Sequence, residues 1–236
     1  MMDGKQMKHA AVSGMIFAWM LVLLALTAAI CAIAGDGELL TREMLRHAPP
    51  ASTGLPEAEY PGMGRMIADY LTGREKDFQY SFTDAAGHTC LCFQQHEADH
   101  MADCRALIRL AGTLRWIAGG IALVSAGIFA LRRPARTAFA QGALRGLAAA
   151  VVIGLLILAW ALIDFDGLFT AFHRLAFTND GWLLDTRTDL LIRLMPITFF
   201  ISLGTRVLAA MMTTALLAGA AAGIVRRRGF RKEQEP

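Results

Sequence analysis

The sequence has 236 residues, of which 55% are hydrophobic, and its mean hydropathy is +0.43. This composition is too apolar for an ordinary soluble domain and indicates an integral membrane protein. The net charge of +3 carries little information by itself, and the sequence contains no nucleic-acid-binding module, P-loop or dinucleotide fingerprint, so we expect no nucleic-acid partner.

Four apolar stretches are long enough to cross a bilayer, which takes about 20 residues of helix. They predict transmembrane helices over about 12–34, 107–131, 144–163 and 197–225, separated on one side by the polar segments 35–106 and 164–196. We therefore expect an all-α polytopic membrane protein with an extracytoplasmic subdomain of short helices and a small β-hairpin. The whole chain, 1–236, is expected to form a single integral membrane domain.

The distribution of charge predicts the orientation of these helices. The link between the second and third stretches and the end of the chain are rich in arginine, whereas segment 35–106 holds twelve acids against six bases. Because positive flanks stay in the cytoplasm, both termini are expected inside. Segments 35–106 and 164–196 are then outside.

The first outer segment contains two local patterns. Apolar residues from Met63 to Leu71 recur at helical spacing. Further on, Phe78, Tyr80 and Phe82 alternate with polar residues before a turn at 84–87, which predicts a β-hairpin.

The stretch "QHEADHMADCRAL", 95–107, is the richest in titratable side chains and allows three interpretations. In a helix, His96, His100 and Asp103 project from one face. The first interpretation is that they are merely solvated residues at the start of a helix, without a functional role. The second is a zinc site, because "HEADH" matches H-E-x-x-H, with His173 or Asp166 as a third ligand. The third is acid–base chemistry, with His100 as base, Asp103 fixing its tautomer, and His173 arriving from the other outer segment.

Arg206 lies about three turns into the last apolar stretch. An unpaired charge at that depth costs several kcal/mol. We therefore expect Arg206 to face an interior cavity that a substrate enters.

Two motifs then show a resemblance to a family. "HMADCRAL" (100–107) and "FHRLAFTNDGWLLDTRTDLLIRLMPITFF" (172–200), together with "MIADYLTG" (66–73), resemble the bacterial lipoprotein intramolecular transacylases, which are four-span plasma-membrane proteins. The resemblance follows nearly the whole chain in order. Cys104 stands where that family usually has valine, and His96 is outside its pattern.

The resemblance implies a bacterial plasma-membrane acyltransferase with its active site facing outside. It would move the sn-2 acyl chain of a diacylglyceryl-cysteine lipoprotein onto the cysteine α-amino group, leaving a lyso-form lipoprotein. The family's functional histidines map onto His100 and His173. Because amine and ester belong to one molecule, no enzyme nucleophile is required.

From this we expect a catalytic set and a substrate-binding set. The catalytic set is His100, His173 and Asp103, and the substrate-binding residues are Phe169, Phe172, Phe177, Trp182 and Arg206. The expected partners are a diacylated lipoprotein and membrane lipid, with no metal and no cofactor, and the sequence does not indicate the oligomeric state. The alternatives are a zinc-dependent membrane hydrolase using His96 and His100, or a non-enzymatic partner-binding membrane protein.

Overall fold

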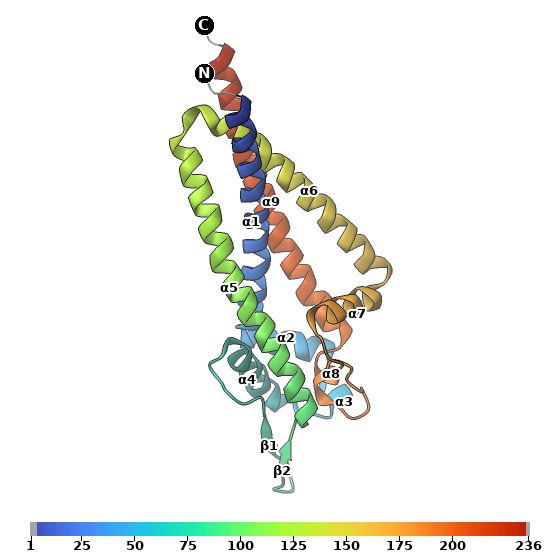
Figure 1. The fold of residues 1–236 in the computed structure, drawn as a ribbon. Helices are drawn as coiled ribbons and strands as arrows, with labels where there is room; N and C mark the ends of the chain where they lie inside the picture. The colour runs from blue at the N-terminus through green and yellow to red at the C-terminus, as the bar shows by residue number, and fades with distance from the viewer. Residues whose placement is uncertain (1–3, 235–236) are drawn as a thin grey trace. The chain divides into compact units, whose positions relative to one another are not determined.

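The computed structural model describes residues 4–234 and is almost entirely helical (Figure 1). Four helices are long and apolar enough to cross a membrane: α1 (Gly4–Ala34), α5 (Gln95–Leu131), α6 (Arg136–Ile163) and α9 (Ile197–Gln234). Each of the four predicted spans lies within one of them. α5 also extends twelve residues before the predicted start of its span at 107, so the stretch 95–106 is helical but polar.

The chain divides into two compact units. Unit 1 consists of residues 1–28, 113–163 and 207–236, and unit 2 consists of residues 29–112 and 164–206.

Small residues let α1 and α6 approach closely in unit 1. A Cβ atom placed on Gly14 would meet the carbonyl of Phe139, and one placed on Gly142 would meet the carbonyl of Ala11. Association of membrane helices depends on such close van der Waals packing, because lipid provides no hydrophobic force between helices. Nearby, Ala18, Leu147 and Ala215 bury one another, which brings α9 into the same cluster.

Unit 2 contains the short elements and the largest hydrophobic core. Besides the ends of α1, α5 and α9, it holds α2 (Gly37–His47), α3 (Pro50–Thr53), η1 (Glu57–Glu59), α4 (Tyr60–Thr72), β1 (Ser81–Thr83), β2 (Thr89–Leu91), α7 (Phe165–Ala176) and α8 (Leu190–Leu194). The core joins α2, α4, α8 and the first turns of α9, and its largest fully buried side chains include Tyr60, Met44, Met63, Ile67, Leu194 and Phe199. The predicted helix around 63–71 is therefore confirmed as α4.

The predicted hairpin is also confirmed, although it is short. β1 and β2 pair antiparallel with Phe82 opposite Cys90. Just beyond the paired residues, the rings of Phe78 and Phe93 lie 4.6 Å apart and are both buried. The hairpin thus leads the chain into α5 with an aromatic contact at its base.

Candidate active site

The two histidines that the sequence singles out meet in unit 2. His100 comes from the polar beginning of α5, and His173 comes from α7. Their ring centroids are 6.2 Å apart, and the residues are only 8% and 7% exposed. Two imidazoles from segments 73 positions apart in the sequence therefore share one buried location.

Local sequence explains how α7 presents His173. The Asp164 carboxylate accepts a hydrogen bond of 2.8 Å from the Gly167 amide, so it caps the helix one residue before its first turn. Phe169 and His173 are then one turn apart on the same face.

The tautomer of His173 follows from one hydrogen bond. Its Nδ1 lies 2.8 Å from the Phe169 carbonyl oxygen, and a carbonyl can only accept, so Nδ1 carries the proton. In the neutral ring Nε2 is therefore the basic nitrogen. Burial lowers the pKa of His173, and the carbonyl hydrogen bond opposes that shift only in part.

Four aromatic rings surround His173. The Phe169 ring centroid is 4.1 Å from that of His173, Trp182 is at 5.0 Å, Phe172 at 5.3 Å and Phe177 at 5.5 Å. The structure therefore brings all four predicted aromatic substrate-binding residues to the histidine. Phe172 is half exposed, whereas Phe177 is buried.

His100 is held more loosely than His173. Its Nδ1 is buried without a hydrogen-bond partner among the described residues, and its Nε2 lies 3.6 Å from the Cys104 sulfur. Burial lowers the pKa of His100 to about 4, with a further contribution from the neighbouring His173. Burial also raises the pKa of the Cys104 thiol to about 12, so this thiol stays protonated beside the ring.

Asp103 joins the two outer segments but by a different contact from the one expected. Its carboxylate accepts a 2.9 Å hydrogen bond from the Asn179 side chain, in the loop that follows α7. Its effect on His100 is electrostatic, because the carboxylate opposes the lowering of the His100 pKa. The sequence predicts that Asp103 fixes the tautomer of His100 by a hydrogen bond, whereas in the structure the Asp103 carboxylate is bonded to Asn179.

Arg206 is paired rather than free. Its guanidinium donates a 2.6 Å hydrogen bond to Glu43 of α2, and the Ser202 hydroxyl donates one of 2.6 Å to the same carboxylate. Burial would raise the pKa of Glu43, but these two hydrogen bonds and the arginine charge outweigh it and lower that pKa. The charge of Arg206 is thus neutralised by an anion within the chain.

The "HEADH" match does not assemble a metal site. His96 Nε2 lies 3.0 Å from the Asp189 carboxylate. The Glu97 carboxylate accepts hydrogen bonds from the backbone amides of Gln94 at 2.8 Å and Leu191 at 2.7 Å. Within residues 4–234, no three or more His, Cys, Asp or Glu residues are grouped so as to hold a metal ion. The donors of the motif point to separate partners, so this residue set does not fit zinc.

Sequence reasoning missed the structural role of Glu97. Its buried carboxylate caps α5 by accepting from the Gln94 amide and also accepts from the Leu191 amide of α8, so it links the two outer segments. The sequence gives only a weak signal for this role, because Glu97 is the third residue of the helix but Gln94 is not a usual N-cap residue. The zinc interpretation of the same residue obscured it.

Comparisons with known proteins identify the family and the fold. The family model for the lipoprotein intramolecular transacylase Lit matches residues 15–200. The solved structure of Lit from Bacillus cereus has a TM-score of 0.74 at 18% identity and covers 94% of this chain and 97% of that chain. Two further solved forms of the Bacillus cereus protein, each with one histidine replaced, have TM-scores of 0.71 and 0.70 at 18% identity, with at least 94% of each chain covered.

No curated protein gives a significant sequence match. The family model nevertheless spans well over half of the chain, and the fold agrees with it. The chain therefore belongs to the lipoprotein intramolecular transacylase family and is a multi-pass membrane acyltransferase.

Proposed function

We propose that this acyltransferase moves the sn-2 acyl chain of a diacylglyceryl-cysteine lipoprotein onto the α-amino group of the same cysteine. The observation that carries the proposal is the buried His100–His173 pair, 6.2 Å between ring centroids, enclosed by aromatic side chains. The family membership excludes the two alternatives, a zinc hydrolase and a non-enzymatic binding protein.

The substrate needs little beyond alignment and proton transfer. The amine and the ester already share a molecule, so binding that brings them together exploits a large effective concentration. The amine nitrogen attacks the ester carbonyl carbon, a C–N bond forms, the bond to the sn-2 oxygen breaks, and the amine proton ends on that oxygen. The products are an amide and an alcohol.

The tautomer of His173 supports it as the general base. Its Nε2 lone pair is free, because Nδ1–H is held by the Phe169 carbonyl. A pKa of about 4 makes His100 a weak base, whereas at His173 the hydrogen bond to the Phe169 carbonyl opposes the lowering of the pKa by burial. These two facts favour the reverse of the roles expected from sequence, in which His100 was the base.

His100 then serves as the donor to the reacting ester. Its Nδ1 is buried without a partner among the described residues. As an N–H it would stabilise the negative charge that develops on the carbonyl oxygen, or give a proton to the leaving sn-2 oxygen. A neutral donor preorganised in a dry site loses little in reorganisation.

The aromatic side chains suit the acyl chain. Phe172 is half exposed beside His173, whereas Phe169, Phe177 and Trp182 are less exposed and contact its ring. We propose that these four residues contact the transferred chain near its carboxyl end. Asp103 then has a positioning role through Asn179, and Arg206 has one through Glu43, since each charge already has a partner.

The proposed location follows from the charge pattern. Arginine-rich flanks support a location of both termini in the cytoplasm of a bacterium and of the histidines at the outer face of the plasma membrane. A diacylated lipoprotein anchored in the outer leaflet would present its ester at that face.

The test is the mass and fragmentation of N-terminal lipopeptides from a host that makes diacyl lipoproteins. Expression of the protein is expected to convert them to lyso forms with an N-acyl group. His173→Gln and His100→Gln should abolish conversion, whereas His88→Gln, which changes an exposed histidine of the hairpin turn, should not. Unchanged diacyl forms with correctly inserted protein would contradict the proposal.

A further inference from the structure

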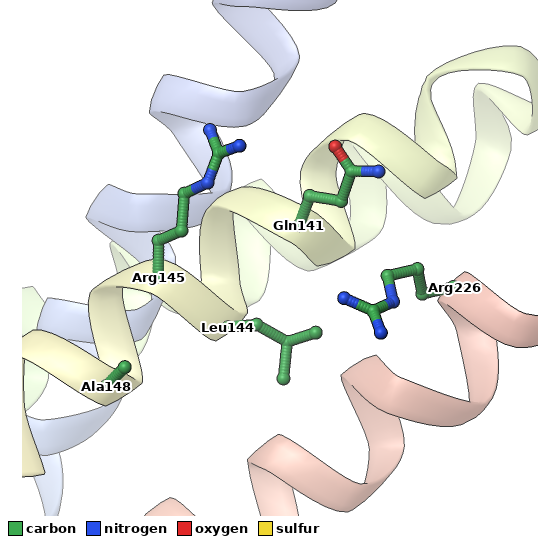
Figure 2. Close-up of a pocket in the computed structure, with 5 residues that line it drawn as sticks. All are labelled: Gln141, Leu144, Arg145, Ala148 and Arg226. Carbon is green, nitrogen blue, oxygen red and sulfur yellow. The ribbon is translucent and has the colours of Figure 1, made fainter.

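Unit 1 contains a basic hollow between α6 and α9. It has a cavity volume of about 340 Å³ and is lined by Gln141, Leu144, Arg145 and Ala148 of α6 and by Arg226 of α9. Figure 2 shows Arg226 extending from α9 towards α6, with Leu144 pointing towards α9. Gln141 and Arg145 are one turn apart and project from the same side of α6.

Both arginines lie where the apolar part of their helix ends. Eighteen uncharged residues follow Arg145 in α6, and nineteen uncharged residues, 207–225, precede Arg226 in α9. At 1.5 Å per residue these runs are about 27 and 28 Å long, close to the thickness of about 30 Å of a bilayer's hydrocarbon core. The two side chains are therefore at the level of lipid headgroups, at the same end of unit 1.

The side chains of unit 1 that the structure describes include no carboxylate. Residues 4–28, 113–163 and 207–232 contain no aspartate or glutamate. Over the described range, no carboxylate lies within ion-pair distance of Arg145 or Arg226. A charge at the hydrocarbon boundary is stabilised by a partner of opposite sign, and the membrane itself supplies such partners in its anionic headgroups.

We propose that this hollow binds the phosphodiester headgroup of an anionic phospholipid. Guanidinium groups match phosphate oxygens in paired hydrogen bonds. The Gln141 amide adds a further donor, and Leu144 with Ala148 provides an apolar wall on which the first part of an acyl chain would lie. Basic pockets between transmembrane helices on the cytoplasmic side recognise lipid headgroups in this way.

The test uses the purified full chain in a zwitterionic detergent and follows its melting temperature. Dihexanoyl phosphatidylglycerol is the anionic probe, and dihexanoyl phosphatidylcholine and inorganic phosphate are the comparison ligands. Saturable stabilisation by the anionic lipid alone is the expected result, because a ligand that binds only the folded state raises its stability. Arg145→Gln and Arg226→Gln should each weaken the apparent affinity by about tenfold.

Arg228→Gln is the matched control, because Arg228 is an exposed arginine of the same helix that does not line the hollow. Affinity unchanged in this variant supports a defined site. An equal loss in Arg228→Gln would mean a diffuse basic surface and would overturn the proposal. Equal stabilisation by inorganic phosphate would also overturn the proposal, because the site would then bind a free anion. Equal stabilisation by phosphatidylcholine would overturn it because the site would not select for negative charge. If Arg145→Gln does not fold, the apparent affinity of Arg226→Gln for the anionic lipid tests the proposal by itself.

Discussion

At the scale of single residues, the proposed chemistry depends on two imidazoles kept neutral by burial. The Phe169 carbonyl fixes the proton of His173 on Nδ1, whereas the Nδ1 of His100 has no partner among the described residues. The two rings are chemically alike, but their surroundings give them different abilities to accept or donate a proton. This difference allows one to accept a proton while the other donates.

The same lowered pKa values predict the pH dependence of turnover. A histidine works as a base only above its pKa, so lowering both pKa values moves the acidic loss of activity below the ordinary histidine range. The attacking α-amino group has a pKa of about 7.7–8.0 and must be neutral. Turnover of a diacyl lipopeptide measured from pH 5 to 9 is therefore expected to rise to a plateau above pH 8, with no histidine titration at the ordinary value of about 6.5. A second titration at about pH 6.5 would show that the histidines are not buried as described.

The sequence indicates which candidate residues come together better than it indicates the contacts that they make. His100 and His173 could be selected because they stand in motifs with family resemblance, and the helical stripe of Phe165, Phe169 and Phe172 is visible in the spacing. The hydrogen bond from Asn179 to Asp103 spans 76 positions. Long-range pairings of this kind depend on tertiary packing and leave no local signal.

At the scale of elements, Glu97 links α5 to α8. Its carboxylate accepts one hydrogen bond from the Gln94 amide before α5 and one from the Leu191 amide of α8, and Glu97 is fully buried. Since α8 leads into α9 and α5 carries His100, the link fixes the two outer segments against each other within unit 2.

Replacing Glu97 with alanine is expected to destabilise the fold strongly. One buried and one partly buried amide would lose a charged acceptor. Each such bond contributes about 1.5–3 kcal/mol, so a loss of about 3 kcal/mol in the free energy of unfolding is expected. Thermal unfolding in detergent measures it. Glu57→Ala, at an exposed glutamate, is the control and should change little. Equal melting temperatures for Glu97→Ala and the unchanged protein would contradict this role.

The crossing of α1 and α6 makes a second prediction at this scale. Gly142→Leu would drive a side chain into the backbone of α1, whereas a Cβ on Gly154 of the same helix meets nothing within 4 Å. We expect Gly142→Leu to lower the yield of folded protein and its melting temperature, at a cost of about 1–3 kcal/mol or more from overpacking. Gly154→Leu should leave both unchanged. The two variants behaving alike would show that the helices do not approach at Gly142.

At the scale of the whole molecule, the four spans were predictable because long apolar runs have few alternatives. The limits of α5 were not, since the polar stretch 95–106 continues the helix without an apolar signal. Its helicity comes from the capping by Glu97 and from packing in unit 2. The zinc interpretation failed for a related reason, because spacing along one helix does not reveal which partners the side chains find.

The orientation of the chain can be tested by chemical labelling. In a cysteine-free variant, Ala86→Cys in the hairpin turn should react with a membrane-impermeant maleimide in spheroplasts, because segment 35–106 is expected outside. Arg228→Cys, near the C-terminal end of α9, should react only after permeabilisation, because this end is expected in the cytoplasm. The opposite pattern would place the histidines in the cytoplasm, away from an outer-leaflet substrate.

The central claim is that the acyl chain moves within one molecule at the His100–His173 pair. The most direct measurement mixes two diacyl lipopeptides, one with an isotope-labelled sn-2 chain and the other with a labelled peptide, and weighs the products. We predict that every N-acyl chain remains on the peptide that carried it as an ester, and that His173→Gln forms no product. Products in which label from one molecule has moved to the peptide of another would contradict the account.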